Sequence, residues 1–194
     1  MKTLLKTTAL VLAFAGPAIA GGHETWKTVD EDSQIAFGSI KSSEFGEVHT
    51  FDALSGSVNE KGEVAVSIEL GSVETNIDIR NERMITHIFK AADARAELTG
   101  SVDFDAVHDL EVGATTVVDF EGALSLVGVS ADVEAELFVA RLSEDRVLVT
   151  TSDMIMLSTY DLGIDAGVDK LKELASLEGI TRVTPVTVRM IFEK

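Results

Sequence analysis

The amino-acid sequence predicts an all-β fold, a single domain of about eight antiparallel strands with two short helices. Apolar and polar residues alternate with a period of two along most of the chain, which is typical of antiparallel sheets with one solvent-facing side. Two segments depart from this pattern and have apolar residues at helical spacing. Eight such strands can close into a barrel or form a two-sheet sandwich, and the alternation is compatible with both.

Residues 1–20 form the first predicted element, a signal peptide. Two lysines precede an apolar run at 9–15, which is too short to span a bilayer because a spanning helix needs roughly 20 residues. Ala18 and Ala20 then provide the small residues required for cleavage. A retained N-terminal anchor is the alternative, but the cleavage pattern favours export. We therefore expect a mature domain of residues 21–194.

The strands fall into two groups by the regularity of their alternation. Regular strands are expected at residues 64–71, 94–104, 118–126, 129–139 and 186–192. Less regular strands are expected at residues 34–41, 48–58 and 147–157. Each strand has an apolar face for a common core and a polar face for solvent.

The two predicted helices interrupt the strands at residues 78–89 and 167–177. In the first, Met84, Ile85 and Ile88 recur at roughly helical spacing among charged residues. The second has one apolar and one charged face. Such helices can cover the ends of a barrel or fill the core at a sheet corner, and both roles remain open at this point.

The chain is strongly acidic, with 33 acidic and 16 basic residues and a net charge of −17. Removal of residues 1–20, which carry two lysines and no acid, changes the net charge from −17 to −19. Such a surface repels nucleic acid and anionic lipid headgroups, so we expect no nucleic acid partner and no stable membrane insertion. The acidity serves solubility or docking onto a basic partner. The chain has no cysteine, so its core alone must stabilise it.

No catalytic motif is present in the sequence. The chain lacks a cysteine nucleophile, a G-x-S-x-G segment, a P-loop and an H-E-x-x-H segment. Its four histidines are scattered without the spacing of metal ligands. We therefore expect a protein that is not an enzyme and requires no cofactor.

The N-terminus of the mature chain carries one local metal-binding pattern. Cleavage after Ala20 would expose Gly21, Gly22 and His23 in that order. The free amine, two deprotonated amides and the imidazole can together bind Cu(II) or Ni(II) in the square-planar geometry that these ions favour. The pattern is compatible with incidental metal binding and with a working copper site, and it favours the first.

Five segments of the sequence resemble the YceI-like domain family, in the family's order and over essentially the whole mature chain. They are W-K-T-V-D-E-D-S-Q-I-A-F (26–37), S-V-E-T (72–75) followed by I-R-N-E-R-M (79–84), G-A-L-S-L-V-G-V (122–129), Y-D-L-G-I (160–164) and K-L-K-E-L-A (170–175). The resemblance implies a periplasmic, lipocalin-like eight-stranded barrel that binds a long isoprenoid lipid, polyprenyl or ubiquinone-like. It also implies a membrane redox protein as a partner, and it is compatible with an oligomer.

The apolar faces of the strands would line the interior of such a barrel. The residues expected to line it and to bind the ligand are Phe37, Ile68, Leu98, Val102, Phe120, Leu124, Val133, Leu137, Met154, Met156, Val188 and Met190. Methionine and small residues make an adaptable lining that suits a flexible chain. Alternatively, these side chains pack on one another and leave no cavity.

Arg80 and Arg83 lie in the first predicted helix, near one end of the expected barrel. They could bind a polar head group such as a pyrophosphate or a quinone carbonyl, or form ion pairs on the surface. The expected function is binding or carrying an isoprenoid lipid. The alternatives are copper binding, or an acidic protein-interaction module with a filled barrel.

Overall fold

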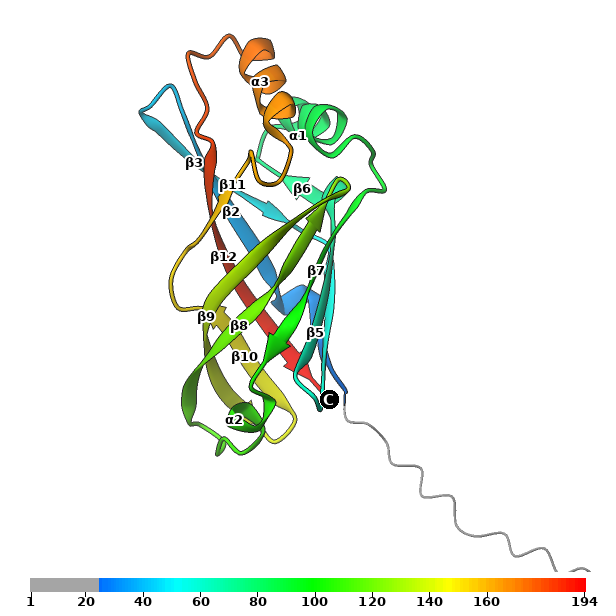
Figure 1. Ribbon diagram of the computed structural model, residues 1–194, viewed down its shortest axis with the longest axis vertical. Coiled ribbons are helices and arrows are strands. Elements are labelled where there is room, and N and C mark those ends of the chain that lie inside the picture. The colour runs from blue at the N-terminus through cyan, green and yellow to red at the C-terminus, as the bar shows by residue number, and fades with distance from the viewer. Residues whose placement is uncertain (1–24) are drawn as a thin grey trace, which may run out of the picture.

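Eight strands of alternating apolar and polar residues close into an antiparallel β-barrel in the computed structural model, which describes residues 25–194 (Figure 1). In spatial order the ring contains β1 (Thr25–Thr28), β4 (Leu54–Asn59), β5 (Glu63–Glu69), β7 (Arg95–Val102), β8 (Thr115–Leu126), β9 (Val129–Ser143), β10 (Arg146–Thr151) and β12 (Val183–Glu193). β1 pairs with both β4 and β12, which closes the ring. The predicted eight-stranded barrel is confirmed. The predicted signal peptide and the metal-binding pattern of Gly21, Gly22 and His23 lie outside the described residues.

Four further strands extend the ring toward one end. They are β2 (Gln34–Lys41), β3 (Phe45–Phe51), β6 (Val73–Glu74) and β11 (Ile155–Ser158). β1 and β2 pair with the same edge of β12, and β10 and β11 share its other edge. Two segments predicted as single strands, 48–58 and 147–157, are therefore each two strands. In the first, the chain stops pairing with β6 and starts pairing with β5 after Phe51, and this bend interrupts the strand.

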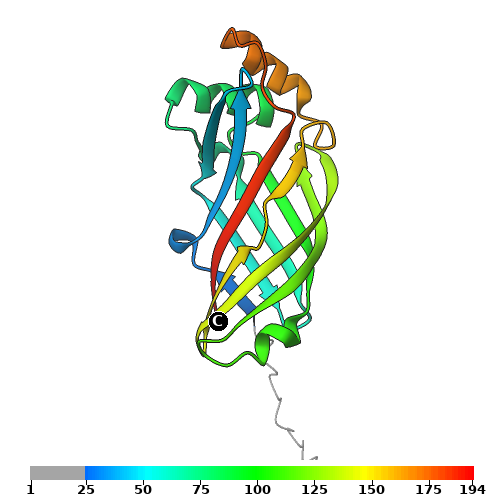
Figure 2. The same cartoon turned by 90° about the vertical axis from the view of Figure 1, so that its left-hand side faces the viewer.

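Helices cover both ends of the barrel (Figure 2). At one end, which we call the helix end, α1 (Asp78–Met84) continues into a π-helical turn, η3 (Ile85–Phe89). Both pack against α3 (Asp165–Leu174). These are the two predicted helices: α1 and η3 together span the predicted 78–89, and α3 begins two residues earlier and ends three residues earlier than the predicted 167–177. At the opposite end, which we call the closed end, α2 (Phe104–His108) was not predicted, because Phe104 continues the apolar alternation of the preceding strand. Within residues 25–194, no helix is both long enough and apolar enough to cross a bilayer.

The backbones of α3 and η3 approach each other closely at Gly167 of α3. A Cβ atom at this position would lie 2.6 Å from the carbonyl oxygen of His87 and 2.9 Å from the Cα atom of Ile88, both in η3. Only glycine permits such a close approach. The absence of a side chain at residue 167 therefore fixes α3 against η3.

A pair of glycines makes room for an aromatic ring inside the barrel. Gly100 of β7 and Gly122 of β8 are cross-strand neighbours. A Cβ atom at either position would lie 2.6 Å from the Cζ atom of Phe120, whose side chain is 4% exposed. The ring of Phe120 thus occupies the volume that two side chains would otherwise fill.

A stacked pair seals the closed end of the barrel. The guanidinium carbon of Arg141 lies 5.1 Å from the ring centroid of Trp26, and both side chains are buried. Arg141 also donates from Nε to the carbonyl oxygen of Ser143 at 2.7 Å. The charge is thus accommodated by an aromatic face and a backbone acceptor.

Candidate functional site

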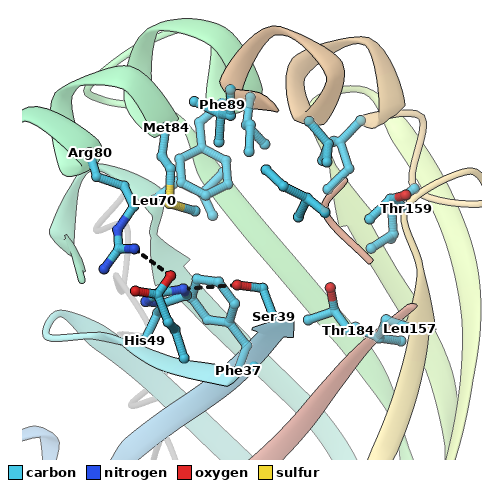
Figure 3. Close-up of a pocket in the computed structure, with 18 of the residues that line it drawn as sticks. Phe37, Ser39, His49, Leu70, Arg80, Met84, Phe89, Leu157, Thr159 and Thr184 are labelled. Atoms are coloured by element: carbon cyan, nitrogen blue, oxygen red, sulfur yellow. Dashed lines mark hydrogen bonds and ion pairs between the residues drawn. The ribbon is translucent and has the colours of Figure 1, made fainter. Parts of the chain in front are cut away.

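A cavity of about 450 Å³ lies between the barrel and the helices of the helix end (Figure 3). We call it the upper cavity. Its large apolar lining residues include Phe37, Phe51, Leu70, Met84 and Phe89. Ile77 and Ile79 line it as well and are 44% and 51% exposed, so the cavity reaches the surface beside α1. An apolar ligand can therefore contact both the interior and the surface of the protein.

A second cavity of about 120 Å³, the lower cavity, lies within the ring of eight strands toward the closed end. All eight ring strands contribute to its lining, together with Phe104 and Val107 of α2. Every lining residue except Thr151 is apolar. Ile35 lines both cavities, so the two are adjacent.

The structure places twelve of the fourteen predicted ligand-binding residues around these cavities. Phe37, Ile68, Arg80, Arg83 and Leu124 line the upper cavity. The residues that line the lower cavity are Leu98, Val102, Phe120, Val133, Leu137, Val188 and Met190. The alternation of the regular strands therefore identified the inward faces of β5, β7, β8, β9 and β12.

The remaining two residues, Met154 and Met156, were wrongly expected to line the interior. They are 65% and 61% exposed. Their neighbours Ile155 and Leu157 line the lower and the upper cavity instead. A slip of one residue turns every side chain of a strand to its other face, and the irregular start of β11 left its register undetermined by the pattern.

A charged network forms one wall of the upper cavity, with residues from β2, β3 and α1. The Glu47 carboxylate accepts from Nη1 of Arg80 at 2.5 Å and from Nζ of Lys41 at 2.9 Å. Nη2 of Arg80 donates to the carbonyl oxygen of Thr75 at 2.6 Å. The hydrogen bond from Arg80 lowers the pKa of Glu47 to about 2. Glu47 is therefore ionised throughout the physiological pH range.

A buried histidine stands beside this network. His49 is 4% exposed, and its Nε2 atom lies 3.2 Å from the Ser39 hydroxyl (Figure 3). Its other ring nitrogen, Nδ1, is buried without a hydrogen-bond partner in the described part of the chain. Burial lowers the pKa of His49, and the positive charge of Arg80 lowers it further. The imidazole is accordingly neutral at pH 7.

Arg83 differs from Arg80 in its surroundings. Both line the upper cavity, but Arg80 is ion-paired to Glu47. Arg83 is half-buried and makes no ion pair or hydrogen bond with any residue between 25 and 194. Of the two predicted head-group residues, Arg83 is the one whose guanidinium is not already occupied.

The polar wall was not predicted from the sequence, although a signal for it exists. Glu47, His49 and Phe51 occupy alternate positions of β3 and all line the upper cavity. Phe51 is apolar, and the alternation from it assigns the other two to the inward face. The prediction treated polar residues as solvent-facing, and it therefore missed the inward polar pair.

The comparisons with known proteins agree with this architecture. The family profile described as "YceI-like domain" matches residues 26–189. The chain belongs to the YceI-like domain family. No curated protein matches the chain.

Three solved structures share the fold. A polyisoprenoid-binding domain from Saccharophagus degradans, implicated in plant cell wall breakdown, is 36% identical with a TM-score of 0.83, covering 87% of this chain and 97% of that chain. BcnA of Burkholderia cenocepacia is 13% identical with a TM-score of 0.66, covering 84% of this chain and 98% of its own. The YceI protein of Campylobacter jejuni is 16% identical with a TM-score of 0.53, covering 75% and 84%. The last two similarities concern the fold alone.

Proposed function

We propose that this protein is a periplasmic carrier that binds one long isoprenoid chain, polyprenyl or ubiquinone-like, inside its barrel. The observation that carries the proposal is the pair of adjacent cavities, which meet at Ile35 and extend from the helix end into the ring. A long apolar chain fits two consecutive apolar spaces better than a compact ligand does. The 36% identical domain from Saccharophagus degradans, described as polyisoprenoid-binding, supports the same ligand class.

The size and lining of the cavities suit such a ligand. The upper cavity, at about 450 Å³, falls within the roughly 300–1,000 Å³ range of small-molecule sites. Burial of apolar surface contributes roughly 25 cal/mol per Å², so each buried isoprene unit can contribute a few kcal/mol. Several buried units would outweigh the entropy lost on binding, and micromolar or tighter affinity is expected.

Binding, and not catalysis, is the proposed activity. Among the described residues, the one carboxylate on the cavity wall, Glu47, is engaged in ion pairs with Arg80 and Lys41. The proposal also includes a periplasmic location and delivery of the bound lipid to a membrane redox protein.

Mass spectrometry of an organic extract tests the proposal. The full chain would be expressed with its leader, purified from the periplasm without detergent, and extracted. A stoichiometric polyprenyl or quinone species is the expected result. Ala96→Phe provides the critical variant, because Ala96 is 2% exposed and lines the upper cavity.

The matched control is Ala65→Phe, which places the same ring at an exposed position of the neighbouring strand β5. The lipid should be depleted from the Ala96→Phe protein and retained by the control. An empty extract from the wild-type protein that also fails to take up added prenyl lipid would overturn the proposed function.

A further inference from the structure

The charges of the chain are distributed unevenly over the barrel. Residues 103–145, which include α2, β8 and β9, contain 11 of the 33 acidic residues. The same segment contains one of the 16 lysine and arginine residues, Arg141, whose side chain is buried beside Trp26. A surface adapted for solubility alone usually has charges of both signs interspersed. This segment therefore has a negative surface without compensating positive charge.

Carboxylates lie directly opposite one another on the outer face of the β8–β9 pair. Asp119 is the register partner of Glu136, and Glu121 is the register partner of Glu134. All four residues are exposed, and none of their carboxylates forms an ion pair or a hydrogen bond with any residue between 25 and 194. Like charges in directly opposed positions destabilise a sheet. No contact within the described chain offsets this repulsion, so a partner outside it is the natural source of positive charge.

Apolar side chains continue the same outer face toward the closed end. Val117 and Phe138 are register partners, two residues along their strands from Asp119 and Glu136, and both are exposed. Leu142 lies four residues beyond Phe138 on β9 and is exposed as well. An exposed apolar patch bordered by polar residues is typical of an interaction surface. The face therefore combines an apolar part with a charged part.

A hollow of about 320 Å³ lies beside this face, where α2 packs near β8 at the closed end (Figure 1). Val117, Asp119 and Glu121 of β8 line it, together with Ala106 of α2. Lysine and arginine side chains have an apolar stem and a charged end. The hollow accommodates such a side chain, because its lining contains both apolar groups and carboxylates.

We propose that the outer face of β8 and β9, with the hollow beside α2, is a docking surface for a basic protein. We call it the acidic face, and its residues are Val117, Asp119, Glu121, Glu134, Glu136 and Phe138. Lysine or arginine side chains of the partner pair with the opposed carboxylates, and an apolar side chain of the partner packs on Val117 and Phe138. Two acidic faces repel each other, as do this face and anionic headgroups, so charge complementarity favours a basic protein over a second copy or a membrane. The proposal does not depend on the lipid, because the face lies outside the barrel.

Three short labelled peptides test the charge and the apolar contact separately. The first alternates lysine and leucine, the second replaces each leucine by serine, and the third replaces each lysine by glutamate. Fluorescence anisotropy measures their affinities for the purified protein. We expect the lysine–leucine peptide to bind more tightly than the lysine–serine peptide, and the glutamate–leucine peptide not to bind. Binding of both lysine peptides should weaken as the salt concentration rises, because salt screens exposed charges.

Two charge variants locate the binding of the lysine–leucine peptide. The double variant Asp119→Asn/Glu136→Gln removes one opposed pair and should bind about tenfold more weakly, which corresponds to two exposed ion pairs. Its stability in urea should not be lower than that of the wild type, because a repulsion is removed. The matched control Asp161→Asn/Glu178→Gln removes two exposed, unpaired carboxylates outside the acidic face, changes the net charge equally, and should bind as the wild type does.

A third variant tests the apolar contact. Phe138→Ser should reduce the affinity for the lysine–leucine peptide to that for the lysine–serine peptide and leave the latter unchanged. Phe45→Ser alters a phenylalanine of β3 that is exposed outside the acidic face, and it should change neither affinity.

Several results would overturn the docking surface. They are a wild-type protein that binds no lysine peptide, equal affinity for the lysine–leucine and glutamate–leucine peptides, equal affinity for the two lysine peptides, and equal losses in the two charge variants. Lipid uptake by the Asp119→Asn/Glu136→Gln protein should match that of the wild type. The docking surface and the proposed function can therefore fail independently of each other.

Discussion

The two cavities of the barrel are both lined by alternating strands and yet differ in size and in polarity. The lower cavity is lined by all eight ring strands, and only Thr151 among its lining residues carries a hydroxyl group. The upper cavity is nearly four times larger and has Ser39, Glu47 and His49 on one wall. These polar residues belong to β2 and β3, which extend beyond the ring. The comparison teaches that the closed ring provides apolar volume, whereas its extensions add polar side chains to the cavity wall.

The largest expected effect tests whether the lower cavity is the structural core. Phe120→Ala should lower the free energy of unfolding by about 3–5 kcal/mol, because it removes a buried ring and enlarges an existing cavity. Urea denaturation monitored by circular dichroism measures the change. Phe45→Ala, at a phenylalanine that is 57% exposed, is the control and should change stability by less than about 0.5 kcal/mol. Equal losses of stability in the two variants would contradict the assignment of the lower cavity to the structural core.

A smaller loss is expected at the glycine pair beneath the same ring. Gly122→Ala introduces a Cβ atom 2.6 Å from Phe120 and 2.3 Å from the carbonyl oxygen of Thr99, so the backbone must move. We expect a destabilisation of about 3 kcal/mol in urea denaturation. Combining Gly122→Ala with Phe120→Leu should recover part of this loss, because the two residues compete for one volume. Additive effects would show that the backbone contact alone is responsible.

The charged wall of the upper cavity should contribute less to stability and make it dependent on pH. Glu47 has a pKa of about 2 in the folded protein and 4.5 as the ordinary value. Because the folded pKa is the lower one, its contribution is complete above about pH 4.5 and disappears as the pH falls toward 2. Glu47→Gln should cost about 2 kcal/mol at pH 7, and the difference from wild type should vanish near pH 2.

The control for this pH dependence is Glu44→Gln. Glu44 is exposed on the same β2–β3 hairpin. Denaturation curves of both variants between pH 2 and 7 provide the measurement. A Glu47→Gln deficit that does not change with pH would exclude the ion pair as its origin.

The smallest effect is expected outside both cavities. Met156→Ser alters a side chain that is 61% exposed and should change stability by less than about 0.5 kcal/mol, with no change in lipid uptake. Leu157→Ser, one residue further along β11, alters the lining of the upper cavity and should reduce uptake. Loss of uptake in the Met156 variant instead would restore the original assignment of the inward face.

The sequence predicted the features of the barrel that depend on regular alternation. The inward residues of β8 and β9, such as Phe120 and Leu137, follow from strict period-two patterns because the pleat repeats every two residues. The interruptions near Ala53 and Met154 could not be predicted in the same way. Bends arise from a change of pairing partner, which a local pattern does not record.

The polar wall escaped prediction for a different physical reason. A buried His49 or Glu47 has the same sequence pattern as an exposed one, and only its spatial partners distinguish the two. Those partners come from separate segments: Arg80 lies 33 residues from Glu47, and Ser39 lies 10 residues from His49. Arg80 and Arg83 were both proposed as head-group residues, and only the fold shows that the first is already paired.

The junction between the first and last strands determines how the molecule can be oriented. Lys27 of β1 is the register partner of Glu193 of β12, so the last strand ends beside β1 at the closed end (Figure 1). The opening beside α1 lies at the opposite end. A protein immobilised on a support through its C-terminal residue would therefore expose the opening of the upper cavity to the bulk liquid. A sensor surface built in this way would need no chemical step to orient the barrels.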